Sequence, residues 1–137
     1  MGMIKTDSEL THSKQKVAEY KLTDKKIPKD VDSTLSQSAL IAANGFVDGI
    51  QNEIDEYEDI KNNKNIPKYM LNIKNIGLLL IGLRIKNNVS QEELSLKINR
   101  EKEYISKREY NDHYGINNYQ IIEILDALGE TLSLNID

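Results

Sequence analysis

The stretch 89-VSQEELSLKINREKEYISKREY-110 decides how the second half of the chain folds. It predicts two short helices joined by a tight turn. The Ser90 hydroxyl can cap the first helix, and Glu93, three residues later, completes a capping box. Leu94 and Ile98 are four residues apart and therefore share one face of that helix.

The turn between these two helices is expected at Asn99, because Asn adopts the left-handed backbone of a helix C-terminus more readily than most residues other than glycine. A second helix then follows at about Glu101–Tyr110 and buries Tyr104 and Ile105. Ser95 is small enough to let the second helix cross the first closely. The pattern indicates a helix-turn-helix, a motif whose second helix enters the major groove of DNA.

Composition narrows the class of protein. The chain has 137 residues, which suits one domain or a small domain with an appendage, and 39% of the residues are hydrophobic. It contains no Cys, which excludes disulfides and thiolate metal sites. No apolar run reaches membrane-spanning length, and the first residues lack the hydrophobic segment of a secretory signal. We therefore expect a cytoplasmic protein without a membrane partner.

The net charge of −4 is unfavourable for DNA binding, because contacts with phosphates supply much of the affinity. The charge is unevenly distributed, however. Residues 84–108 contain seven Lys or Arg and four Glu residues, whereas residues 1–65 contain nine Lys and twelve acidic residues. The excess of basic residues coincides with the predicted helix-turn-helix. A ratio of seven basic to four acidic residues is also compatible with an ordinary solvated surface.

Residues 1–65 predict a helical hairpin. A first helix is expected from about Asp7 to Lys21, with Thr6 as its cap. A charged connector containing Pro28 follows, and a longer helix runs from about Ser33 to Ile60.

Apolar residues in the longer helix recur every three or four positions, as on one face of an amphipathic helix; they include Phe46, Ile50, Ile54 and Tyr57. Gly45 and Gly49 lie near its middle, where we expect a bend or a close contact. The hairpin either extends one small core or serves as a dimerisation arm or partner-binding surface.

Residues 66–137 are expected to form the second domain, with its first helix in the segment Ile73–Asn87. Three apolar residues give that helix an inward face: Ile76, Leu80 and Leu83. Leu79 and Ile81 lie off this face, so we expect the N-terminal hairpin to cover them.

A last helix is expected at Tyr119–Leu128, ending at Gly129. Residues Thr131–Ile136 alternate apolar and polar side chains, which is typical of a half-buried strand. A single strand is not stable alone, so this segment predicts a short C-terminal β-strand that pairs with its copy in a homodimer. The expected fold class is therefore all-α, with this strand as the one exception.

The segments SQEELSLKIN (90–99) and EYISKRE (103–109) resemble the Cro/repressor-type (XRE) helix-turn-helix family. That family has the pattern [ST]-Q-x-x-L-[AS]-x-x-[IL]-[GN], then a turn and -x-[IV]-[SQ]-[RK]-x-E. The resemblance covers residues 73–136. It implies a lambda-repressor-like domain and a sequence-specific transcriptional repressor that regulates its own promoter.

The same resemblance assigns roles to individual residues. Gln91 is expected to contact a phosphate and to steady the reading helix. The groove-facing positions are Lys102, Glu103, Ser106 and Lys107. A Lys can donate to guanine, a Glu can accept from cytosine and a Ser can do either. Arg100 and the segment Tyr110–Tyr114 are expected to contact the DNA backbone, and Arg84 and Glu109 match a partly buried salt bridge that supports the fold.

Two features depart from the commonest family pattern. Arg108 stands where many relatives have an apolar or aromatic residue, which predicts a rotated or locally loosened second helix, and Asn99 replaces the commoner Gly. The N-terminal hairpin resembles an extension found in a subset of the family. Some of these proteins are antitoxins encoded beside small ribonuclease toxins, so a toxin partner is an alternative within this interpretation.

An enzymatic site is not expected. His12 and His113 lie far apart without companions at ligand spacing, so we predict neither a metal nor a cofactor. Adjacent acids such as Glu92 and Glu93 point in different directions around a helix. No glycine-rich phosphate loop or Gly-x-Ser-x-Gly turn occurs.

The preferred hypothesis is a homodimer that presents two reading helices, roughly 34 Å apart, to a near-palindromic operator in double-stranded DNA. The rival hypothesis is a protein-interaction module with a vestigial helix-turn-helix. The net negative charge favours this rival.

Overall fold

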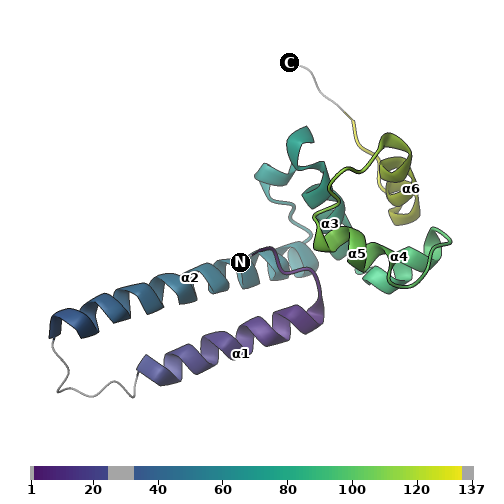
Figure 1. Cartoon of the computed structure of the whole chain (residues 1–137). Helices are drawn as coiled ribbons and strands as arrows, with labels where there is room; N and C mark the ends of the chain where they lie inside the picture. The colour runs from purple at the N-terminus through teal and green to yellow at the C-terminus, as the bar shows by residue number, and fades with distance from the viewer. Residues whose placement is uncertain (1, 25–32, 134–137) are drawn as a thin grey trace. The chain divides into compact units, whose positions relative to one another are not determined.

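The computed structural model describes residues 2–24 and 33–133, and within them every regular element is a helix (Figure 1). The α-helices are α1 (Asp7–Asp24), α2 (Ser33–Asn63), α3 (Ile76–Lys86), α4 (Gln91–Lys97), α5 (Tyr104–Tyr110) and α6 (Asn118–Leu128). Two short 3-10 helices, η1 (Lys68–Met70) and η2 (Ile73–Asn75), precede α3. The predicted all-α class is confirmed for the described residues, and none of their helices has both the length and the apolar character needed to cross a membrane.

The chain divides into two compact units, Met1–Tyr57 and Glu58–Asp137. The division falls inside α2, a few residues before the boundary predicted after residue 65. The final turns of α2 therefore belong to the second unit.

In the first unit α1 and α2 form the predicted hairpin (Figure 1). The Thr6 hydroxyl accepts a hydrogen bond from the Glu9 backbone N–H at 3.1 Å, which explains why α1 begins where it does. Tyr20 and Phe46 pack edge to face, with ring centroids 5.1 Å apart. Among the residues of this unit whose side chains are described, the buried apolar ones are Ile4, Val17, Ile50, Ile54 and Tyr57.

Gly45 does not make the expected close contact. A Cβ atom built on Gly45 meets no described heavy atom within 4 Å, and α2 continues through this position. The predicted connector falls largely on residues 25–32, which lie outside the described residues.

In the second unit α3 is buried on more than one face. Leu80 and Leu83 are buried as predicted, and Leu79 and Ile81 are buried as well. Part of the cover comes from η1, because the fully buried Met70 places its sulfur 3.0 Å from a Cβ atom built on Gly82. Residues that precede α3 in the sequence therefore help to shield it, a role that the sequence analysis gave to the hairpin alone.

Gly77 allows the turn after α5 to approach α3 closely. A Cβ atom built on Gly77 would lie 1.9 Å from the backbone oxygen of Asp112. Any side chain at this position would displace the turn, so the glycine is required by tertiary packing.

The first motif helix, α4, begins with Ser90, whose hydroxyl accepts from the Glu93 N–H at 3.0 Å. The second motif helix starts later than predicted: α5 begins at Tyr104, whereas Glu101 was expected as its first residue. The Tyr104 N–H donates to the Glu101 carbonyl at 3.0 Å, so residues 101–103 form a turn. Lys102 and Glu103 thus lie immediately before α5 and outside the helix.

The last helix, α6, is fixed at both ends by local chemistry. Asn117 and Gln120 form a reciprocal capping box at its start, and Gly129, with φ of 69°, ends it as predicted. Residues Thr131–Ser133 do not form a strand. The rest of the predicted strand lies outside the described residues.

Candidate nucleic-acid interface

The helices α4 and α5 cross at Ser95, which is fully buried. Its hydroxyl donates to the Gln91 carbonyl at 2.8 Å and accepts from the Ile105 backbone N–H at 3.0 Å. One small side chain therefore both permits the close approach and satisfies an orphan donor in the first turn of α5. Leu94, Ile98 and Ile105, the apolar residues predicted for the inner sides of the motif, are buried as well.

The turn between the two helices depends on Asn99, which has a φ of 59°. This is the left-handed conformation predicted from the sequence. The backbone N–H of Arg100 donates to the Ser95 carbonyl at 2.9 Å and closes the end of α4.

Arg100, predicted to contact the DNA backbone, already has protein partners. Its guanidinium lies 5.3 Å from the centre of the Tyr104 ring, and Nη2 lies 3.5 Å from Oε1 of Glu123 on α6. Both charged side chains of that ion pair remain substantially exposed, so the contact is weak and can be exchanged for a phosphate.

Behind α5, a polar network fixes the helix to the rest of the unit. Arg84 and Glu109 form the buried ion pair expected from the resemblance. Gln91 adds a hydrogen bond from Nε2 to Oε1 of Glu109 at 2.9 Å. The Gln91 side chain therefore steadies α5, which is one of the two roles expected of it.

The predicted base-reading residues lie together at the start and on the exposed side of α5. The Lys102 side chain is 66% exposed, and its Nζ atom lies 3.9 Å from Oε1 of Glu103. The Ser106 hydroxyl donates to the Glu103 carbonyl at 2.9 Å and is half-buried. Lys107 is exposed. These side chains can donate and accept hydrogen bonds with a binding partner that approaches this side of α5.

Arg108 is half-buried, and its Nε and Nη2 atoms are buried without a hydrogen-bond partner among the described residues. From the sequence, Arg108 was expected only to rotate or loosen the second motif helix, and no contact was predicted for it. Together with Lys107, Asn111 and Tyr114 it lines a pocket of about 450 Å³ at the end of α5. The available signal was a charged side chain at a position where the helix-turn-helix pattern that the sequence resembles usually has an apolar residue.

The segment Tyr110–Tyr114 divides into exposed and buried positions. Tyr110 and Tyr114 are 84% and 88% exposed, whereas His113 is buried. The two tyrosines are therefore available to a partner, and His113 belongs to the interior.

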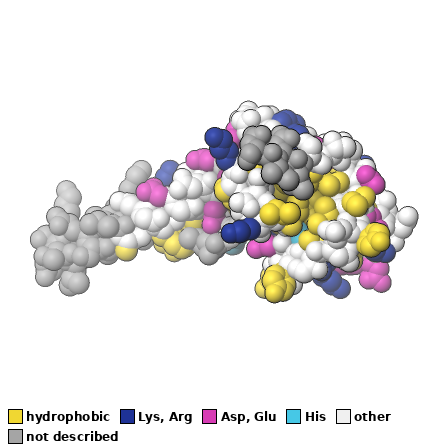
Figure 2. All heavy atoms as spheres, turned by 90° about the horizontal axis from the view of Figure 1, so that it is seen from above, with side chains coloured by type: hydrophobic (Ala, Val, Ile, Leu, Met, Phe, Trp, Pro, Cys, Tyr) yellow, Lys and Arg dark blue, Asp and Glu magenta, His cyan; other side chains and the backbone are white. Residues whose placement is uncertain are grey.

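Large apolar side chains are also exposed in the second unit; beyond Tyr110 and Tyr114 they are Tyr69, Leu71, Ile73, Leu96, Tyr119, Ile122 and Leu132. Figure 2 shows apolar side chains gathered on one face, with positive and negative side chains around them. Exposed apolar surface of this kind is typical of contact with another macromolecule.

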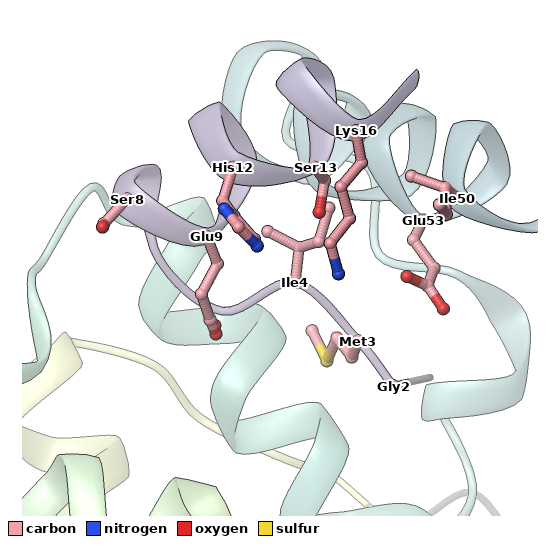
Figure 3. Close-up of a pocket in the computed structure, with 10 residues that line it drawn as sticks. All are labelled: Gly2, Met3, Ile4, Ser8, Glu9, His12, Ser13, Lys16, Ile50 and Glu53. Atoms are coloured by element: carbon pink, nitrogen blue, oxygen red, sulfur yellow. The ribbon is translucent and has the colours of Figure 1, made fainter. Parts of the chain in front are cut away.

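The first unit contains a separate pocket of about 520 Å³ between the N-terminal segment and the two hairpin helices (Figure 3). Ile4 and Ile50 supply apolar contacts, and His12, Lys16 and Glu53 extend around them. Burial raises the pKa of the Glu53 carboxyl, and Lys16 opposes this rise. Within the described residues, no three His, Asp or Glu side chains are grouped so as to hold a metal ion.

Comparison with known proteins gives no relative: no family model, no curated protein and no solved structure matches the chain. Any role for α4 and α5 must therefore be inferred from the contacts and exposure of their own side chains.

Proposed function

We propose that the chain is a sequence-specific DNA-binding regulator of transcription that acts as a repressor. The observation that supports this most is the arrangement of α4 and α5. Ser95 joins α4 to α5, and the Arg84–Glu109 pair fixes α5 to α3. Lys102, Glu103 and Lys107 are exposed at the start and on the outer side of α5. A rigidly held short helix with donors and an acceptor on its outer side is what base recognition requires.

The dimensions of α5 suit the major groove. An α-helix with its side chains is roughly 10–12 Å across, and the major groove of B-DNA is roughly 12 Å wide, so the groove can admit α5. Lys102 and Lys107 can donate to guanine O6 and N7, and Glu103 can accept from cytosine N4. Because Glu103 lies 3.9 Å from Lys102, the two can also restrict each other to one orientation.

Binding should be selective because the whole protein is acidic. A net charge of −4 weakens sequence-independent attraction to phosphates, so affinity must come from matched contacts at α5. This reasoning predicts a large ratio of specific to non-specific affinity.

The decisive experiment is selection of double-stranded DNA from a random pool by the full chain, followed by fluorescence anisotropy with the enriched sequence. K102A/K107A should bind it at least ~30-fold more weakly, because each lost base contact is worth about 1–3 kcal/mol. K68A/K74A is the matched control: it removes the same charge from two exposed lysines on η1 and η2 and should stay within about threefold of the parent. The proposal fails if no sequence is enriched or if K102A/K107A binds like the control.

Homodimerisation is part of the proposal. Two copies would place their α5 helices in successive major grooves, roughly 34 Å apart, on a near-palindromic operator such as the protein's own promoter. The enriched DNA should therefore contain two inverted half-sites, and sedimentation of the complex should give two chains per duplex. The antitoxin hypothesis remains a prediction within this function.

A second candidate, a protein-interaction module, is favoured by the exposed apolar side chains of the second unit. Tyr119 and Ile122, three residues apart on α6, are 86% and 55% exposed. If the protein binds a protein partner through this face, Y119A/I122A should abolish that complex while K102A/K107A leaves it intact. Measuring the effect of Y119A/I122A and of K102A/K107A on each complex therefore distinguishes protein binding from DNA binding.

A further inference from the structure

Three large apolar side chains project into solvent from the segment that precedes α3. Tyr69, Leu71 and Ile73 are 47%, 62% and 70% exposed. Among the described residues, no other Leu or Ile side chain is as exposed as Leu71 and Ile73. A lysine at each end of the segment is exposed as well. We call this surface the lysine-flanked patch, and it consists of Lys68, Tyr69, Leu71, Ile73 and Lys74.

The backbone beneath the patch is held in one conformation. Met70 is fully buried and anchors the segment on α3. The Asn75 side chain donates from Nδ2 to the Tyr69 carbonyl at 2.7 Å, and the Asn72 side chain accepts from the Lys74 backbone N–H at 3.0 Å. The apolar side chains are therefore presented by a braced segment, which a partner does not have to order on binding.

The patch lies in a part of the sequence without negative charge. Residues 60–91 contain no Asp or Glu and six Lys or Arg residues, although the whole chain has a net charge of −4. Of the six, Arg84 and Lys86 are paired with acidic residues of α5 and of the segment after α6. Lys68 and Lys74 form no ion pair with a described residue. The patch therefore combines apolar surface with positive charge.

This combination selects one class of partner. Phosphates of DNA would match the lysines but leave three apolar side chains in water. An isologous contact with the same patch of a second copy would place lysines opposite lysines. A single small apolar cluster gives only marginal attachment to a lipid surface, and the net negative charge opposes approach to an anionic one. A protein segment that carries both apolar side chains and carboxylates matches both parts of the patch.

We propose that the lysine-flanked patch binds an acidic, amphipathic segment of another protein. Apolar side chains of that segment cover Leu71 and Ile73, and its carboxylates pair with Lys68 and Lys74. Both short helices, η1 and η2, pack on α3, and Figure 1 shows them above α3 with α4 and α5 below it. A partner bound there leaves the exposed side of α5 open. The interaction thus goes beyond the proposed DNA-binding function and does not depend on it.

The probe is a short peptide, selected by the full chain from random sequences displayed on phage and then measured by fluorescence anisotropy. The enriched peptides should carry Asp or Glu beside apolar residues. L71A/I73A should bind the selected peptide at least ~10-fold more weakly, because it removes the apolar anchors. K68A/K74A should weaken binding ~3-fold or more at low salt and less at high salt, because salt screens exposed charges. Both variants change exposed side chains and should melt at the temperature of the parent.

Two control variants are matched to these. Y119A/I122A removes exposed apolar side chains from α6, and K102A/K107A removes two exposed lysines at α5. Both should bind the peptide within about twofold of the parent, because they lie outside the patch. In the DNA measurement the two lysine variants exchange roles, so failure of peptide binding and failure of DNA binding are separate results.

Four outcomes would overturn the proposal. The first is that no acidic peptide is enriched, and the second is that L71A/I73A binds the peptide like the parent or that only Y119A/I122A loses it. The third is sedimentation with vesicles of phosphatidylserine and phosphatidylcholine that L71A/I73A abolishes, which would assign the patch to a lipid surface. The fourth is self-association of the peptide-free protein that L71A/I73A abolishes, which would assign the patch to a second copy.

Discussion

Arg84 and Glu109, 25 positions apart in the sequence, form a buried ion pair with two parallel hydrogen bonds between α3 and α5. Nε lies 2.6 Å from Oε2, and Nη2 lies 2.7 Å from Oε1. Arg84 also donates from Nη1 to the Val89 carbonyl at 2.9 Å, and Gln91 donates to Glu109. The pair sets how α5 is oriented on the second unit, and hence what its exposed side presents.

Replacing Glu109 with Ala should destabilise the protein by about 3–5 kcal/mol, because the Arg84 guanidinium stays buried without its counter-ion. Urea denaturation followed by circular dichroism measures the loss. The double variant R84M/E109L should recover most of it, since no charge is then buried. A loss below about 1 kcal/mol for Glu109→Ala would mean that the pair behaves like a surface salt bridge.

Replacing Ser95 with Ala should cost about 1–2 kcal/mol, because the Ile105 N–H loses its acceptor at the crossing of α4 and α5. Hydrogen exchange of the Ile105 amide should accelerate in parallel. Ser106→Ala is the matched control. Among the described residues its hydroxyl donates only to the Glu103 carbonyl, in a hydrogen bond exposed to solvent, so the stability of the protein should change by less than about 0.5 kcal/mol. Equal effects of the two substitutions would argue against a special role for Ser95.

Replacing Gly77 with Ala should destabilise the second unit by at least about 1–3 kcal/mol, because the new methyl group would lie 1.9 Å from the Asp112 carbonyl oxygen. Relief requires movement of the turn that holds Asn111 and Tyr114. Thermal unfolding measures the stability.

The control for Gly77→Ala is the same change at Gly45 in α2, where a Cβ atom meets no described heavy atom within 4 Å. Gly45→Ala should stabilise the protein by about 0.5–1 kcal/mol, because Ala has the higher helix propensity. We therefore expect Gly77→Ala to lower the free energy of unfolding and Gly45→Ala to raise it. If both substitutions raised it, helix propensity and not tertiary packing would dominate at both positions.

Glu130 predicts a pH dependence of stability. A hydrogen bond from Asn87, with a further contribution from Lys86, lowers the pKa of the Glu130 carboxyl below its ordinary value, although burial opposes this. A lowered pKa in the folded state means that the carboxylate stabilises the fold above the ordinary pKa, and that this stabilisation is lost as the pH falls through the lowered pKa. Glu130→Gln should cost about 0.2–1 kcal/mol near pH 7, and the difference should disappear at acidic pH. A constant difference in urea denaturation at both pH values would contradict this assignment.

Much of the fold was predictable because its signals are local. Ser90 caps α4, Asn99 takes the left-handed conformation and Gly129 ends α6, and each depends on atoms only a few residues away. The start of α5 was predicted at Glu101 and is observed at Tyr104. Residues 101–103 form a turn closed by the bond from the Tyr104 N–H to the Glu101 carbonyl, and a sequence pattern does not distinguish such a turn from the first turn of a helix.

The amino-acid sequence by itself determined that the described chain is helical, that Thr6 and Ser90 cap helix starts, that Gly129 ends the last helix, and that Ser95 lies at a helix crossing. Only the tertiary structure decided that Gly77 must be a glycine and that two guanidinium nitrogens of the half-buried Arg108 have no hydrogen-bond partner among the described residues. Caps and periodicity arise from contacts within one or two helical turns. The surroundings of Gly77 and Arg108 are built by segments that meet only after the helices pack, so no local pattern encodes them.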